Sequence, residues 1–541
     1  MTDPTPPASA PANGSRPFHW LTPNLTVFVS SLCIMVVELV AGRLIARYVG
    51  NSLYTWTSVI GIVLAGIAVG NYAGGLIADR YRPREALASL FLVASAACLT
   101  VPLLNDRIGA SLMFRQQDWA LRIALHVFAV FFAPAAVLGA ISPVAATMAL
   151  EIGKHTGRTV GSVYSWGAVG SIVGTFLTGY LLIAQMGTVA VLFTVSGILF
   201  AASLYFGARS MLPFVWGGVL SACLLAAAGP WEWTQTIGVR LGFRQAENSR
   251  VYFSEESNYS FIRVEEERDE PGIRFMTLDF LIHSYINFND FNDLRYDYER
   301  IYADITRANV ASLPGGRRPR ALFLGGGGFV FPGWLLRQFP GAYADVAEID
   351  PEVTRAAFEA FGLRPNLMMA IHNLDARNHI EDLLAQQAAG KDAGNFDLIY
   401  GDAFNHYSPP FHLTTYEFNE KARRLMSDDG MMLANVIDVY RSGLFVGAVI
   451  HTFEKTFPHV YAFSATPGGP SDSDPRDTFV VLGSLKPLNE SSGFYEALRR
   501  DMLTSEHLAV LKQRSRGLIL TDDFAPVDNL LAPVIRMADK S

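Results

Sequence analysis

Four consecutive glycines follow an apolar run in the stretch ALFLGGGG, residues 321–328. The apolar run is typical of a buried strand, and Gly325, Gly326 and Gly327 would let a ligand approach the backbone closely. The next acidic apolar run, DVAEID, carries Glu348 about 20 residues further on, where an acid suits a pair of ribose hydroxyls. The order and the spacing favour a nucleoside site over a purely structural turn.

The residues after the turn argue against a diphosphate. GGGGFVFP does not fit the pattern G-x-G-x-x-G, and Phe331 and Pro332 stand where a helix N-terminus should receive phosphate. The chain has a formal charge of −7, and its second half has no basic cluster, which argues against nucleic acid as a partner. We therefore expect an uncharged or cationic nucleoside, with room for a cationic small molecule.

A sheet must hold this turn, and residues 245–541 have the pattern of one. Short β-branched runs alternate with helical stretches, which predicts an α/β domain with a parallel sheet and helices on both faces. Ligands of such sheets bind at the carboxyl ends of the strands. The expected strands are ALFL, DVAEID, FDLIYGDAF, MMLANVID and TFVVLGS, of which the third ends in Asp402.

The first half of the chain is of another kind. Residues 1–22, rich in Pro, Ala and Ser, are expected to be a disordered tail, and residues 23–230 a helical transmembrane domain with the lipid bilayer as its partner. All three cysteines lie in its apolar segments without metal or redox spacing, so no disulfide scaffold or metal site is predicted. The seven expected spans are about 25–46, 54–77, 86–104, 123–149, 160–183, 188–206 and 211–228.

Two features of these spans have alternative interpretations. Glycines at four-residue spacing, such as Gly66, Gly70 and Gly74, predict close helix packing, with a substrate path between helices as the alternative. Glu38 and Arg43 predict an internal ion pair or a snorkelling arginine, and the alternative makes Glu38 part of a site for an amine.

The motifs GGGG, EIDPEV, NLDARN, DLIYGDAFN and PPFHLTTYEF, in this order, resemble the polyamine synthase family, the spermidine synthase type of aminopropyltransferase. Together with the apolar half, the chain resembles membrane-fused spermidine synthase-like proteins. The resemblance implies a β-hairpin lid over residues 245–300 and a class I methyltransferase-like domain over 301–541. It implies no resident cofactor: S-adenosylmethionine or its decarboxylated form is a co-substrate. An amine is the implied acceptor, and a homodimer stays open.

The resemblance also implies roles for single residues. Glu348 would hold the ribose, Asp375 would meet the adenine amino group, and Asp402 matches the family's proton acceptor. The chemistry agrees, because a protonated amine must lose its proton before it attacks the carbon next to a sulfonium. The structural alternatives are a helix cap for Asp402 and a solvated turn for Asp375.

Segments ahead of the sheet match the family's lid. Tyr259 and Asp279 stand in matching places of NYSFIRVEEE and RFMTLDF. The segment RYDYERIY resembles the one that closes over the acceptor: Tyr296 lies in it, Tyr298 replaces the usual histidine, and Glu299 matches the family's acid. The alternative for these tyrosines is that they are half-buried core aromatics.

Three positions depart from the family pattern. Gly328 replaces the aspartate that normally receives the amine of the aminopropyl donor, Asn405 replaces an acid that helps to hold a diamine, and Ser260 replaces a glutamine. Intact S-adenosylmethionine, with its own carboxylate, would be repelled less at such a site, so the donor stays open. Near the end, Asp522 and Asp523 would cap the last helix or lend charge to the acceptor side.

Three functions compete. The first is aminopropyl transfer with release of methylthioadenosine, the second is a lyase or methyltransferase acting on S-adenosylmethionine, and the third is a nucleoside-sensing domain on a polyamine-transporting membrane half. Because the donor is cytoplasmic, we expect a multi-pass protein of the inner or plasma membrane with its catalytic domain in the cytoplasm. Basic residues are balanced between the two ends of the spans and do not decide this. An eighth span or a re-entrant segment within 123–149 would put both chain ends inside.

Overall fold

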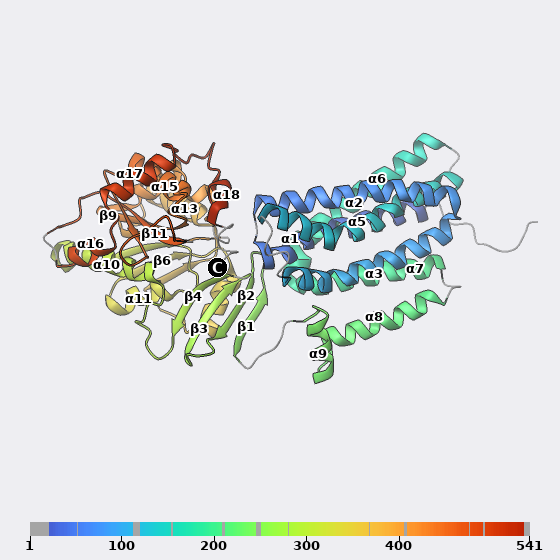
Figure 1. Cartoon of the computed structure of the whole chain (residues 1–541), viewed down its shortest axis with the longest axis horizontal. Coiled ribbons are helices and arrows are strands. Elements are labelled where there is room, and N and C mark those ends of the chain that lie inside the picture. Colours follow the sequence, from blue (N-terminus) through green and yellow to red (C-terminus); the bar gives the residue numbers. More distant parts are fainter. Residues whose placement is uncertain are drawn as a thin grey trace, which may run out of the picture.

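The computed structural model describes residues 21–534, apart from 51, 112–118, 153–154, 208–210, 245–249, 280, 367, 405–407, 475 and 491–492. The expected tail up to residue 20, and Asn405, lie outside the described residues. The chain forms two bodies placed end to end, a bundle of long helices and an α/β half (Figure 1).

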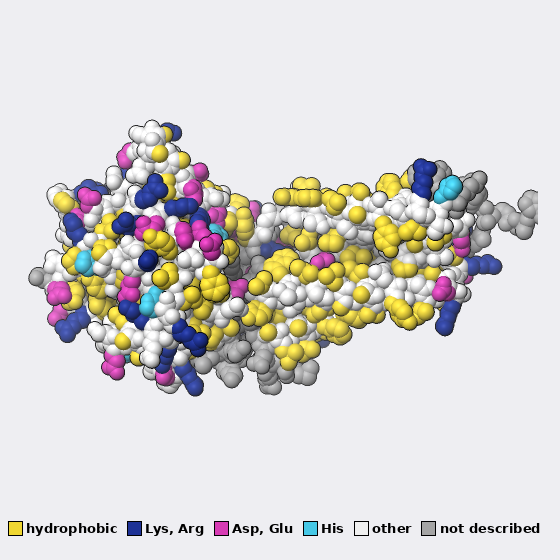
Figure 2. Space-filling model, turned by 90° about the horizontal axis from the view of Figure 1, so that it is seen from above, with side chains coloured by type: hydrophobic (Ala, Val, Ile, Leu, Met, Phe, Trp, Pro, Cys, Tyr) yellow, Lys and Arg dark blue, Asp and Glu magenta, His cyan; other side chains and the backbone are white. Residues whose placement is uncertain are grey.

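The helical half consists of apolar helices with few charges. Among the described residues, six helices are long and apolar enough to cross a membrane, and a pair bent by 105° would give a seventh crossing. Hydrophobic side chains cover this half, whereas charged ones gather on the α/β half and at the far end of the bundle (Figure 2). The helices are α1 (Leu21–Val49), α2 (Leu53–Arg80), α3 (Pro83–Gly109), α5 (Trp119–Ile152), α6 (Thr156–Leu177), η1 (Thr178–Leu182), α7 (Ile183–Gly207) and the bent pair α8 (Leu212–Ala228) and α9 (Glu232–Arg240).

Each expected span coincides with a long helix, and the span 160–183 runs from α6 through η1 to the start of α7. The stretch 123–149 is part of one helix, α5, that runs through Pro134 and Pro143, so it contains no re-entrant break. The glycines pack helices together: a Cβ on Gly70 would come 2.0 Å from the carbonyl oxygen of Ala136 in α5. The spacing of the glycines thus places α2 directly against α5.

A four-stranded antiparallel sheet, which we call the lid sheet, begins the α/β half. Its strands pair in chain order: β1 (Val251–Glu256), β2 (Phe261–Glu266), β3 (Ile273–Leu278) and β4 (Leu281–Asn287). The larger sheet has seven strands in the order β10-β11-β9-β8-β5-β6-β7, with β11 antiparallel to both neighbours. These strands are β5 (Arg320–Leu324), β6 (Tyr343–Ala347), β7 (Met369–His372), β8 (Phe396–Gly401), β9 (Met426–Asp438), β10 (His459–Ser464) and β11 (Asp477–Ser484).

The side chains of the central strands alternate between two buried cores. Leu322 and Leu324 of β5 face one core, and Phe323 faces the other, as the two-residue period of a strand requires. The predicted fold class, a helical bundle followed by a methyltransferase-like α/β domain, is confirmed, and the predicted β-hairpin is part of a larger, four-stranded antiparallel sheet. The remaining elements are α10 (Asp297–Ser312), η2 (Pro314–Gly316), α11 (Val330–Gln338), α12 (Pro351–Ala360), α13 (Ala376–Ala388), η3 (Phe411–Leu413), α14 (Tyr416–Arg424), α15 (Leu444–Thr456), α16 (Tyr495–Asp501), α17 (Ser505–Arg514) and α18 (Val527–Leu530).

Two arginines of α1 join the halves. Arg43 donates to the backbone carbonyls of Ser257, over 2.6 Å, and of Tyr259, in the turn between β1 and β2. Arg47 pairs with Glu256 over 2.8 Å. Arg43 therefore binds the lid sheet, and the ion pair with Glu38 that the sequence allowed is not its role.

Candidate active site

The glycine turn lies between β5 and α11 and is bound to Glu348. Gly325 and Gly327 have φ angles of +107° and +49°, which residues other than glycine rarely adopt. The backbone N–H groups of Gly326 and Gly327 donate to Oε2 of Glu348 over 2.9 and 3.2 Å, and Oε1 accepts from Asp350. Burial raises the pKa of Glu348. Gly325, Gly326, Gly327 and Glu348, four of the residues expected to bind the nucleoside, thus form one unit, in which Glu348 orders the turn.

Asp375 lies beside this unit as the N-cap of α13. One carboxylate oxygen accepts from the backbone N–H groups of Arg377 and Asn378 over 2.9 and 3.1 Å, and the other lies 2.9 Å from Nε2 of His412. The hydrogen bond to His412 is the main reason that the pKa of Asp375 is lowered. Asp375 is therefore an ordered, ionised cap rather than a solvated turn.

Asp522 supports the same region instead of capping the last helix. Its carboxylate binds Arg377, with one contact of 2.8 Å, and accepts from Thr415 over 2.7 Å. The N-cap of α18 is Pro526, so the expected cap is wrong for Asp522. Asp522 instead joins the starts of α13 and α14.

Asp402 follows β8 and is partly buried in a pocket next to the glycine turn. Its Oδ2 accepts from the hydroxyl of Tyr298 over 3.0 Å, and its Oδ1 accepts from the side-chain amide of Asn435 over 2.8 Å. Burial raises the pKa of Asp402 to about 6, while these two hydrogen bonds act to lower it. The carboxylate is thus mostly ionised at neutral pH and oriented by two donors, which is what a general base requires.

The first turn of α10 forms the wall opposite Asp402. Burial and the charge of Asp402 raise the pKa of Glu299 to about 8, so this carboxyl is mostly neutral at pH 7. Within the described part of the chain, its Oε2 has no hydrogen-bond partner. Tyr296 donates its hydroxyl to the carbonyl of Ile282 over 2.7 Å, which ties α10 to β4. Glu299 is therefore a buried carboxyl with an oxygen left for a ligand.

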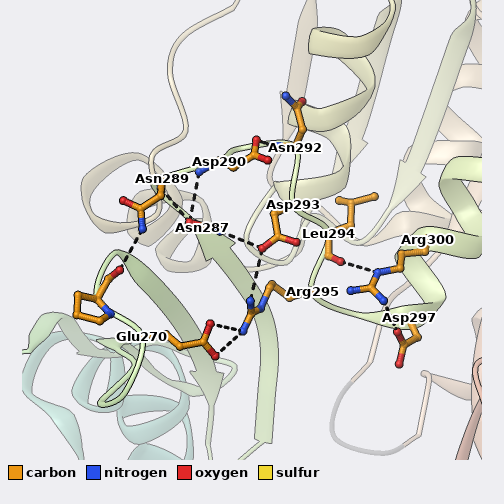
Figure 3. A network of polar contacts seen from close by, with 11 residues as sticks. Glu270, Asn287, Asn289, Asp290, Asn292, Asp293, Leu294, Arg295, Asp297 and Arg300 are labelled. Atoms are coloured by element: carbon orange, nitrogen blue, oxygen red, sulfur yellow. Dashed lines mark hydrogen bonds and ion pairs between the residues drawn. The ribbon is translucent and has the colours of Figure 1, made fainter.

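A polar network holds the loop that precedes α10 (Figure 3). Asn287, at the end of β4, donates to Asp293 over 2.9 Å and accepts from the backbone of Asn289 over 2.9 Å. Arg295 reaches across to Glu270 with contacts of 2.8 and 2.9 Å. These bonds set where α10 begins and so where its first turn faces the pocket.

The pocket also contains residues that sequence reasoning missed. Burial lowers the pKa of His283 to about 4, so its imidazole is neutral, and among the described residues its Nε2 has no partner. Asn435 lies in an expected strand, but no pattern showed that its side chain would meet Asp402. Arg476 lines the pocket and directly precedes β11. Because β11 runs antiparallel to β9, β11 begins at the edge of the sheet where the parallel strands end. This rule locates Arg476 only once β11 is known to be antiparallel, which no pattern in the sequence indicated. The aromatic side of the pocket comprises Tyr302, Phe323, Phe331 and Tyr400.

Two residues expected in the lid, Tyr259 and Asp279, do not line the pocket. Burial and the nearby charges of Asp350, Asp375 and Glu348 raise the pKa of Tyr259, which places Tyr259 on the nucleoside side. Asp279 accepts from the backbone N–H of Phe261 over 3.0 Å and closes the lid sheet. Asp279 is not among the residues that line the pocket.

Comparisons with known proteins agree with the resemblance. No family model matches the chain. A polyamine aminopropyltransferase from Vibrio vulnificus is 29% identical over 243 residues, which cover 43% of this chain and 77% of that protein. Polyamine aminopropyltransferase 1 of Streptomyces coelicolor is 23% identical over 450 residues, which cover 80% of this chain and 77% of that protein. The second match is longer than the α/β half, so it extends into the helical half.

Among solved structures, a probable spermidine synthase from Corynebacterium glutamicum aligns with a TM-score of 0.44 and 21% identity, over 52% of this chain and 99% of that one. The two relatives named above are polyamine aminopropyltransferases, which confirms the predicted resemblance and the predicted type of transferase. Other relatives are methyltransferases: an N-terminal histidine N-methyltransferase from Emericella nidulans is 29% identical over 217 residues, which cover 39% of this chain and 35% of that protein.

Proposed function

We propose that the α/β half transfers an aminopropyl-type group from a sulfonium nucleoside to an amine and releases methylthioadenosine. The observation that carries this proposal is the ionised Asp402, which is partly buried and doubly hydrogen-bonded beside the glycine turn that Glu348 orders. The names of the relatives support the same class of reaction.

The chemistry needs a base and a dry site. Asp402 takes the proton of the ammonium group, the amine nitrogen forms a bond to the carbon next to sulfur, and the carbon–sulfur bond breaks. Its electron pair stays on sulfur, so the product is a neutral thioether. The aromatic side of the pocket excludes water, and its ring faces favour a sulfonium cation.

Intact S-adenosylmethionine is the second candidate donor, and Arg476 favours it. Arg476 lines the pocket, and its charge acts on Tyr296. A guanidinium is well suited to a carboxylate, which intact S-adenosylmethionine carries and its decarboxylated form lacks. Methyl transfer, or cleavage in which the substrate's own carboxylate displaces methylthioadenosine, would then replace aminopropyl transfer.

One experiment separates these functions. The detergent-solubilised chain is incubated with each donor, with and without a diamine, and the nucleoside products are identified. Methylthioadenosine that forms only with the decarboxylated donor and an amine supports the proposal. Methylthioadenosine from S-adenosylmethionine alone indicates a lyase, and S-adenosylhomocysteine indicates a methyltransferase. Binding of both donors without any product indicates a sensor.

Arg476→Gln tests the choice of donor. We expect the affinity for S-adenosylmethionine to fall by about 10-fold or more, the scale of a lost hydrogen bond to a charged group, while that for methylthioadenosine stays unchanged. Calorimetry with both nucleosides checks this. Arg500→Gln, which removes a guanidinium away from this pocket, is the control. An equal loss of affinity for both nucleosides would mean that Arg476 does not bind the carboxylate of S-adenosylmethionine.

Glu348→Gln should weaken methylthioadenosine binding by roughly 1–3 kcal/mol, because the glycine turn and the ribose both rely on its two acceptor oxygens. Calorimetry measures the loss. Glu381→Gln, which removes an exposed carboxylate paired with Lys421, provides the comparison. If Glu348→Gln and Glu381→Gln bind alike, the ribose is held elsewhere.

Tyr298→Phe should move the acidic limb of the pH–rate profile upward. The hydroxyl of Tyr298 stabilises the charged form of Asp402, so its removal raises the pKa of Asp402 above about 6. The base is then protonated over a wider range, and turnover falls first at low pH. Tyr285→Phe, a change on β4, serves as the control. An unshifted limb would show that Asp402 does not set it.

We also propose that the α/β half lies in the cytoplasm, where the donor is made. The chain enters α1 at the end of the bundle far from the α/β half (Figure 1), so seven crossings would place the tail outside. A cysteine at position 541, in a chain without the native cysteines, should resist an impermeant thiol reagent in intact cells. Labelling at position 541 would mean that the α/β half lies outside the cytoplasm, away from the proposed donor.

A further inference from the structure

A carboxylate and two imidazoles meet near the edge of the large sheet, away from the pocket. Asp345 comes from β6, His372 ends β7, and His379 lies in the first turn of α13. Oδ1 of Asp345 is 2.8 Å from Nε2 of His379 and 3.3 Å from Nε2 of His372. The two imidazole rings stack with their centroids 4.3 Å apart. In the described part of the chain, this is the one place where three such groups lie within 4.8 Å of one another.

We propose that Asp345, His372 and His379 bind a divalent transition metal ion, with zinc as the best match. Two imidazole nitrogens and a carboxylate oxygen are a donor set that zinc uses, together with a water molecule or other fourth ligand. The side chains of Asp345 and His379 are 7% and 4% exposed, whereas that of His372 is 39% exposed. The site is thus closed on the protein side and open at one ligand, which gives an ion a route of entry and a place for water.

The arrangement has a simpler alternative, a hydrogen-bonded cluster without metal. In that cluster Oδ1 of Asp345 is hydrogen-bonded to His379 and in longer contact with His372. A metal ion bound by the three atoms would replace these two contacts of a single oxygen with three bonds to one ion. Metal titration distinguishes the two arrangements directly.

The position of the site gives the metal a role in holding the nucleoside unit. The ligands His372 and His379 bracket the turn that carries Asp375. The carbonyl of His372 accepts from the backbone N–H of Glu348 over 3.0 Å, and Asn373 donates to the carbonyl of Glu348 over 3.1 Å. An ion that joins β6, β7 and α13 would fix this turn without touching the reacting atoms.

The test uses the full chain in detergent after treatment with a chelator. Titration with Co²⁺, followed by its visible absorption, should give saturable binding of one ion per chain, and Zn²⁺ should displace it. His372→Gln and His379→Gln should each lower the affinity by about 100-fold or more, since even partners outside the ligand shell are worth 10- to 100-fold. His451→Gln, which removes an imidazole beside Glu454 on α15, should leave binding unchanged.

The outcomes are decisive without any enzyme assay. Zn²⁺ should also raise the thermal unfolding midpoint of the parent chain and not that of His372→Gln. Because His372 is half-exposed, this variant decides the matter even if the buried His379→Gln fails to fold. Absence of saturable binding, or binding that survives in His372→Gln, would overturn the proposal. Neither result depends on the transferase proposal, which methylthioadenosine binding and product analysis test separately.

Discussion

Asp402→Asn should lower turnover by about 100-fold or more and leave methylthioadenosine binding nearly intact. The amide has almost the shape of the carboxylate and can still contact Tyr298 and Asn435, so the pocket should keep its form. It cannot take a proton from an ammonium group. The loss should therefore appear in the rate of the chemical step, which single-turnover kinetics with saturating donor measures.

Asp438 provides a matched control for this prediction. Burial raises the pKa of both Asp402 and Asp438 to about 6. Asp402 follows β8, and Asp438 is the last residue of the neighbouring strand, β9. Asp438, however, accepts from the backbone N–H groups of Phe445 and Val446 at the start of α15. Asp438→Asn should lower thermal stability but not the turnover of the folded protein. Equal activity of Asp402→Asn and the parent would remove Asp402 from the mechanism.

This pair also shows which signals in the sequence were informative. A shifted pKa alone does not separate a base from a helix cap. The edge rule for parallel strands does not separate them either, because Asp402 and Asp438 both lie at the carboxyl ends of neighbouring strands. The rule does place Asp402 and Glu348 beside the glycine turn, and both positions follow from the apolar runs before them. The same rule failed for Arg476, since nothing in TFVVLGS indicated an antiparallel strand.

Other parts of the site depend on side-chain directions that no local pattern encodes. Asn435 meets Asp402 only because β9 pairs with β8 in one particular register. The cluster of Asp345, His372 and His379 joins three elements, and its spacing matches no metal motif. The contact of Arg43 with the lid sheet requires the two halves to be docked. In each case the contact depends on tertiary packing between distant segments, which short stretches of a single sequence do not encode.

Gly328 is the position where the structure most changes an expectation. Because the resemblance places acids at positions 328 and 405, the sequence predicts that Gly328→Asp together with Asn405→Asp raises transfer to a diamine. A Cβ at residue 328, however, would lie 2.4 Å from Cε1 of Phe361 and 2.9 Å from Cβ of Ser284. Phe361 is fully buried. The space beside the fourth glycine is thus occupied by an aromatic ring.

Gly328→Asp should therefore destabilise the protein rather than restore activity. Overpacking of a buried site costs about 1–3 kcal/mol, and an unpaired buried carboxylate adds to this. Thermal unfolding in detergent, with and without methylthioadenosine, measures the loss. Gly493→Asp, at a glycine with open space around it, should change stability by no more than about 0.5 kcal/mol. Similar melting of Gly328→Asp and Gly493→Asp would show that Phe361 moves aside.

Removing the ring gives the decisive variant. Phe361→Ala alone should cost about 3–5 kcal/mol, so it is the reference for Phe361→Ala with Gly328→Asp. With the ring gone, the new carboxylate has room beside the turn and can pair with the primary amine of the decarboxylated donor. Its affinity relative to that of S-adenosylmethionine should rise by about 10-fold or more, the scale of a hydrogen bond to a charged group. An unchanged ratio would mean that a side chain at 328 does not reach the donor, and would leave Arg476 as the residue that selects it.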